Sequence, residues 1–115
     1  MLIEAKVIAH LKDKLGTDYV YAEMPEQVPS SFVLVSVRER TRANYIDRAT
    51  LETHSYAKSK AEASALNDFV MASMESLPEH DEISAARFGG CDDDPDAWLE
   101  MYRYRSVFNL VYYDD

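Results

Sequence analysis

The most restrictive feature of the chain is residues 31–37, a short segment with hydrophobic side chains on both faces of an extended strand. Side chains alternate across a strand, so Phe32 and Leu34 lie on one face and the three valines of this segment on the other. Such a strand has to be interior to its sheet or covered on both sides. The chain therefore requires a sheet with a covering layer, and its 115 residues suit a single domain, residues 1–115, with one core.

Two segments have the hydrophobic period of an amphipathic helix. Apolar positions repeat every four residues in 1–15, and Gly16 follows as a C-terminal stop. The second helix begins at Ser59 with Glu62 three positions later, which is the form of a capping box, and it ends before Pro78. Its expected inner face consists of Ala63, Leu66, Phe69, Val70, Met74 and Leu77.

Most of the remaining chain alternates with a period of two, which is typical of strands. The expected strands are 18–23, 31–37, 48–57, 82–88 and 99–113. Between them, 38–47 is predicted as a hairpin connection or an extended arm, and 89–96 as a loop. The order α-β-β-β-α-β-β with hairpin-linked strands predicts an α+β fold in two layers. We expect a mostly antiparallel sheet of about five strands, with both helices packed on one face.

The charge balance excludes several classes of function. Lys and Arg total 12 and Asp and Glu total 21, which gives a formal net charge of −9. Such a chain lacks the basic stripe that binds nucleic acid or an anionic membrane surface. No apolar run approaches the roughly 18 residues that span a bilayer, and we expect no signal peptide. A single cysteine, Cys91, excludes an intrachain disulfide and a CxxC site.

The sequence contains no recognisable catalytic or metal-binding pattern. His10, His54 and His80 have neither HxxH nor HExxH spacing, and no phosphate loop or GxSxG turn occurs. Pro95 interrupts the acidic run 92–96, so we interpret this run as a solvated turn, not a calcium loop. We therefore expect no enzymatic activity, no cofactor and no metal. The remaining alternative is a small-molecule-binding or hydrolytic domain that uses His54 and nearby carboxylates.

Two concentrations of charge are candidates for contacts with other molecules. The candidate subunit or partner interface lies in the arm and consists of Arg38, Arg40, Arg42, Tyr45 and Arg48. The alternative is a solvated hairpin tip, because exposed ion pairs contribute only about 0 to 1 kcal/mol. The candidate acidic channel or loop surface consists of Asp92, Asp93, Asp94 and Asp96. Residues 102–105 alternate tyrosine with arginine, but strand alternation separates the two types, which disfavours a single-strand nucleic-acid groove.

Five segments carry a resemblance to a known family: Ile3–Val7, Val20–Val35, Asn44–Ala57, the helix that follows, and Tyr102–Tyr113. In these segments and in element order, the chain resembles the tail terminator proteins of long-tailed bacteriophages and prophages. These proteins are also called tail completion or head–tail joining proteins. Two loops depart from the pattern, because 37–43 lacks glycine and 90–98 is unusually acidic.

The resemblance implies a structural, non-enzymatic subunit that closes into a ring, typically a hexamer, on the last ring of the tail tube. Its partners would be copies of itself, the major tail tube protein and the head connector, in the host cytoplasm and then in the virion. DNA would pass through the ring without specific binding, past an acidic wall to which it does not stick. Another connector or neck protein of similar fold is the alternative.

Overall fold

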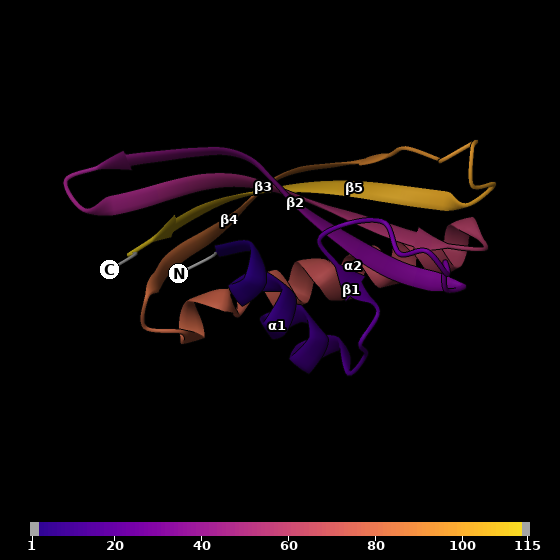
Figure 1. The fold of residues 1–115 in the computed structure, drawn as a ribbon, viewed down its shortest axis with the longest axis horizontal. Coiled ribbons are helices and arrows are strands. Elements are labelled where there is room, and N and C mark those ends of the chain that lie inside the picture. The colour runs from indigo at the N-terminus through magenta and orange to yellow at the C-terminus, as the bar shows by residue number, and fades with distance from the viewer. Residues whose placement is uncertain (1–2, 114–115) are drawn as a thin grey trace.

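The computed structural model describes residues 3–113 and has two layers, a sheet and a pair of helices on one of its faces (Figure 1). The helices are α1, Ile3–Leu15, and α2, Lys60–Glu75, followed by a short 3₁₀ helix η1, Leu77–Glu79. The strands are β1, Val20–Tyr21; β2, Ser31–Ala43; β3, Ile46–Ala57; β4, Ile83–Asp93; and β5, Tyr102–Tyr112. The predicted α+β class and element order are confirmed, although Met1 of the first predicted helix lies outside the described residues.

The sheet has the strand order β1-β2-β3-β5-β4. Only β1 runs parallel to its neighbour, through Val20 opposite Val33 and Tyr21 opposite Leu34, and the other neighbours are antiparallel. Because β1 is so short, most of β2 is an open edge, and β4 is the edge on the other side. Open edges present unpaired backbone groups to other chains.

The main core lies between the helices and the sheet, and it confirms the predicted strand faces. The sheet contributes Val33, Val35, Ala49, Leu51, Phe108, Leu110 and Tyr112 to it, all buried. Phe32 points to the opposite face, where it stacks on Tyr56 with ring centroids 4.4 Å apart. Tyr21, Leu99 and Met101 pack around this second cluster. The outer face at this end is therefore partly covered by the chain itself.

Helix α2 begins as its sequence predicts, since the Ser59 hydroxyl accepts a hydrogen bond from the Glu62 amide at 3.2 Å. Its predicted inner face is wrong at Phe69, which is 66% exposed. Asn67 is buried instead, because it falls on the same helical stripe as Ala63 and Val70. The Ser106 hydroxyl donates to Asn67 Oδ1 at 2.8 Å, which satisfies this buried amide.

Two strands are longer than the sequence predicts. Strand β2 continues through the predicted arm, so the hairpin connection shrinks to Asn44 and Tyr45. The loop predicted for 89–96 is wrong up to Asp93, because β4 extends that far beside β5. Gly90 sits at a register shift with φ +140°, which a side chain would strain. Acidic residues are tolerated in an edge strand because their side chains remain in solvent.

Candidate assembly surface

The tip of the β2–β3 hairpin, residues 38–48, projects at one end of the sheet and is called the arm below (Figure 1). Its two turn residues, Asn44 and Tyr45, have φ of 53° and 65°. Two successive positive φ values are what a two-residue hairpin turn requires. Tyr45 is 87% exposed, so the arm ends in an aromatic side chain that packs on almost nothing.

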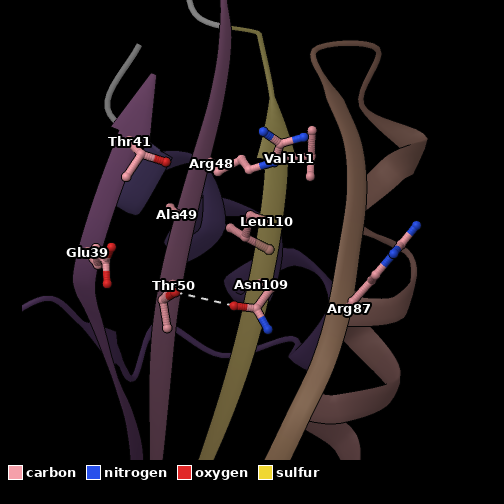
Figure 2. Close-up of a pocket in the computed structure, with 9 residues that line it drawn as sticks. All are labelled: Glu39, Thr41, Arg48, Ala49, Thr50, Arg87, Asn109, Leu110 and Val111. Carbon is pink, nitrogen blue, oxygen red and sulfur yellow. Dashed lines mark hydrogen bonds between the residues drawn. The ribbon is translucent and has the colours of Figure 1, made fainter. Parts of the chain in front are cut away.

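A register shift between Val37 and Glu39 divides the arginines of the arm between two faces. Such a bulge inserts one extra residue and inverts the alternation beyond it. Arg40 lies opposite Ala49 and so belongs to the face that carries the helices, as does Arg42. Figure 2 shows Arg48 on the outer face, and Arg38 reaches Glu52 at 3.1 Å. The predicted basic group is therefore present at the arm, but it is presented in two directions.

The arginines of the arm also differ in their roles. Arg42 makes a bidentate pair with Asp47, with Nε–Oδ1 and Nη2–Oδ2 distances of 2.9 and 3.1 Å. Asp47 is only 5% exposed, so this pair holds the hairpin together across the turn.

A hollow of about 460 Å³ opens on the outer face beside the arm (Figure 2). It is lined by Glu39, Thr41, Arg48, Ala49, Thr50, Arg87, Asn109, Leu110 and Val111.

The four aspartates lie at the opposite end of the sheet, within residues 92–101, called the acidic end below. Asp93 pairs with Tyr104 near the start of β5, whereas Asp47 of the arm pairs with Tyr112 at the end of β5. Asp92 accepts two hydrogen bonds from Arg105, at 3.0 and 3.2 Å. These bonds raise the pKa of the Arg105 guanidinium.

Arg103 organises the turn of the acidic end. Its Nε donates to the Asp94 carbonyl at 2.7 Å, its Nη2 to the Asp94 carboxylate at 2.8 Å, and its Nη1 to the Tyr56 hydroxyl at 3.0 Å. Asp96 Oδ1 accepts from the amides of Trp98 and Leu99 at 3.0 and 3.2 Å. The turn thus combines these side-chain hydrogen bonds with backbone ones between Asp94 and Arg103 and between Asp96 and Met101. Trp98 at its apex is 94% exposed.

The aspartates are occupied by cations of the chain itself. Lys60 lies 3.3 Å from Asp93, and the hydrogen bond between them raises the pKa of the lysine. Within residues 3–113, these aspartates do not gather into a group of three with metal-ligand spacing. The acidic turn is therefore built as an ion-paired surface.

The residues of the hydrolytic alternative come only partly together. His54 Nε2 lies 3.3 Å from Glu52 Oε1, and burial, followed by the charge of Arg103, lowers the pKa of His54. A hollow of about 250 Å³ reaches His54 but is not lined by Glu52. In the described part of the chain, His54 Nδ1 is buried without a hydrogen-bond partner and Nε2 lies next to Glu52, so a nucleophile next to a base is missing.

The fold brings together two histidines that are 70 positions apart in the sequence. His10 Nδ1 lies 3.0 Å from His80 Nε2, and Glu79 is beside both. The sequence offered no local spacing for this group, because its members come from α1 and from the residues after α2. Only the helix packing reveals it.

No helix in the part of the chain that the structure describes is long and apolar enough to cross a bilayer. No protein-family model and no curated protein sequence matches the chain. Its fold is similar to that of a chain in the solved virion of a native gene transfer agent particle, with a TM-score of 0.69. The match covers 97% of this chain and 95% of that chain at 15% sequence identity. At this identity the similarity establishes a shared fold.

Proposed function

We propose that this protein is a structural virion component that closes into a ring, with six copies as the expected number, on the end of a phage tail tube. There it would join the tube to the head connector, as a tail terminator does. The fold shared with a virion chain supports a structural role in a phage-like particle. The opposite charges of the two sheet ends carry the proposal of ring formation.

The arm and the acidic end have the properties of two complementary halves of one joint. The arm contains four arginines against Glu39 and Asp47, whereas residues 92–101 contain five carboxylates. Four of these carboxylates pair with Lys60, Arg103 and Arg105, so the joint would exchange or share these partners. A contact between unlike patches of two copies is heterologous, and it produces a ring when the rotation closes. Opposite charge steers such copies into register.

Each end also carries an exposed aromatic side chain, Tyr45 on the arm and Trp98 on the acidic end. Tyrosine, tryptophan and arginine are the residues that most often dominate interface energetics. Tyr45 has a backbone conformation that a bulky residue adopts only at a cost, yet its ring stabilises little within the chain. We therefore assign both rings to contacts with neighbouring copies or with the tail tube.

The first experiment measures the mass of the purified protein by light scattering, with and without the tail-tube protein. The proposal expects a multiple of the chain mass, or closure of a ring when tail tubes are added. Electron microscopy of the product should show closed rings with a central opening. A protein that stays monomeric under both conditions contradicts the proposal.

A charge exchange then tests the joint itself. Arg40→Glu combined with Arg48→Glu should abolish assembly, and so should Asp92→Lys combined with Asp93→Lys. Mixing the two variants should restore oligomers that contain both. The unaltered arm of the lysine variant can bind the unaltered acidic end of the glutamate variant, and the two altered ends attract each other with their charges exchanged. Lys6→Glu combined with Lys12→Glu on α1 changes net charge equally and should leave assembly intact.

The same aspartates have a competing assignment, the wall of a DNA channel. In a ring built through the proposed joint, added salt weakens assembly because the joint is ionic. In a ring that uses the aspartates as its channel wall, the variant Asp92→Lys combined with Asp93→Lys should still assemble. It should then retain DNA, because its channel wall carries positive charge. Loss of assembly therefore places the acidic end in the joint between copies, and assembly with retained DNA places it on the channel wall.

A connector or neck protein of similar fold is the second candidate, since a virion chain with this fold supports either role. The position of the gene distinguishes them, because a tail terminator gene is expected next to the major tail protein gene. In both cases the protein would assemble in the host cytoplasm and end in the virion, without enzymatic activity. Hydrolysis at His54 is the third candidate. Support for it would require that the unaltered protein hydrolyses a substrate and that His54→Asn does not.

A further inference from the structure

The group His10, Glu79 and His80 lies on the helical side of the molecule, in neither of the two charged ends. His10 is 3% exposed and comes from the inner side of α1. Glu79 is the last residue of η1, and His80 directly follows it. One nitrogen of each ring and one oxygen of Glu79 lie within 4.8 Å of one another. Three donors of this kind from distant segments are a recognisable ligand set.

The hydrogen bonds of His10 fix which of its nitrogens is available. Its Nε2 lies 2.8 Å from the carbonyl oxygen of Ser73 and 3.1 Å from the Ser76 hydroxyl. A carbonyl only accepts, so Nε2 carries the proton and Nδ1 keeps its lone pair. That lone pair faces His80 Nε2 at 3.0 Å. Histidine ligands of metals are oriented in this way, with the second nitrogen donating to a backbone carbonyl.

The distances fit a small divalent cation. With bonds of about 2.0 to 2.1 Å, neighbouring ligands of a tetrahedral zinc ion lie about 3.3 Å apart. His10 Nδ1 is 3.0 Å from His80 Nε2 and 3.7 Å from Glu79 Oε1. The third separation, between Glu79 and His80, is within 4.8 Å, so rotation of these two outer side chains would admit the ion. A pair of imidazoles with one carboxylate favours zinc over magnesium or calcium.

We infer that His10, Glu79 and His80 form a binding site for a late first-row divalent cation, zinc foremost, with water in the fourth position. The ion would replace the hydrogen bond between the two rings and would tie α1 to the segment after α2. Lys14 already contacts Glu79, with Nζ 3.2 Å from each carboxylate oxygen. Lys14 is therefore a competitor of the metal. The inference is independent of ring formation.

The test is a calorimetric titration of the chelator-treated full chain with Zn²⁺, with Mg²⁺ as the comparison ion. The expected result is one Zn²⁺ per chain and a higher Tm with zinc, with no effect of Mg²⁺. His80→Asn should weaken zinc binding by at least about 100-fold, since even loss of a partner behind a ligand costs 10- to 100-fold. Circular dichroism checks that this variant is folded.

Three further variants separate a metal site from a hydrogen-bonded pair of rings. Glu79→Gln changes an exposed side chain and should weaken zinc binding, whereas Lys14→Gln should strengthen it by removing the competitor. His54→Asn is the matched control and should bind zinc as the unaltered chain does. Substoichiometric binding to the unaltered chain overturns the inference. So does an unchanged affinity in Glu79→Gln, or a loss in His54→Asn equal to that in His80→Asn.

Discussion

The arm and the acidic end are both hairpin tips with an exposed aromatic ring, yet their shapes are maintained by different forces. The arm keeps its main-chain ladder up to Ala43 opposite Ile46, and one ion pair, Arg42 with the buried Asp47, is added across its turn. The acidic end continues past Asp93 through the hydrogen bond from the Asp94 amide to the Arg103 carbonyl and through the Asp96–Met101 bridge. The side chains of Arg103 and Asp96 add the hydrogen bonds that shape its turn. Side-chain charge therefore has a larger part in the shape of the acidic end than in that of the arm, where the ladder reaches the two turn residues.

The largest difference is expected when the central cation of the acidic end is removed. Arg103→Ala deletes hydrogen bonds to Asp94 and Tyr56 and leaves the turn without its cation. Because the site is partly solvated, we expect a loss of about 2 kcal/mol in the free energy of unfolding, or roughly 8 °C in Tm. Urea unfolding and calorimetry measure both quantities.

Arg105→Ala is the matched control for this variant, since within residues 3–113 Arg105 pairs with the exposed Asp92 alone. It should be close to neutral for stability, and so should Arg40→Ala on the arm. Equal losses at Arg103 and Arg40 would mean that both ends depend on their charges in the same way, and the contrast between them would be lost.

The exposed tryptophan should affect assembly without affecting folding. Trp98 packs on little within the chain, so Trp98→Ala leaves the unfolding free energy unchanged. If the ring anchors a neighbouring copy, its removal should cost about 2 kcal/mol of association, or about 30-fold in affinity. Sedimentation over a concentration series gives the association constant. Phe69→Ala, which removes an exposed ring from α2, should leave association unaltered.

Sequence periodicity predicted most of this fold because burial and alternation agree along the chain. The strand faces at Phe32 and Val33 follow from a period of two, and the cap at Ser59 from a local hydrogen bond. The errors arise where polar residues form regular structure. Strand β4 continues into Asp92 and Asp93 because pairing with β5 supplies the backbone hydrogen bonds that side-chain polarity does not reveal.

The candidate site was less accessible to sequence analysis. The arginines of the arm were identifiable as a local cluster, but their division between two faces depends on the bulge at Arg38. Asn67 inside the core and the approach of His10 to His80 depend on contacts between distant segments. A single sequence contains no periodic pattern that specifies such contacts.

Tyr45 offers a test in which stability and assembly move in opposite directions. Its φ of 65° suits glycine, so Tyr45→Gly should stabilise the hairpin by about 1 kcal/mol. The same change removes the ring and should weaken assembly. Chemical unfolding and sedimentation of one preparation measure both effects. A variant that is less stable and assembles normally would show that the ring serves the fold, contrary to its assignment as a contact.

The smallest expected effect is a pH dependence confined to the acidic end. Burial lowers the pKa of His54 below its ordinary 6.5, and the charge of Arg103 acts in the same direction. Just below pH 6.5 the unfolded chain therefore binds more protons than the folded chain, so stability falls as the solution becomes more acidic. His54→Asn should flatten this slope below pH 7. Since protonated His54 would lie beside Arg103, hydrogen exchange at pH 5 should accelerate in residues 92–101 before it does in 38–48. Faster exchange in the arm would contradict the view that the acidic end depends more than the arm on its charges for its shape.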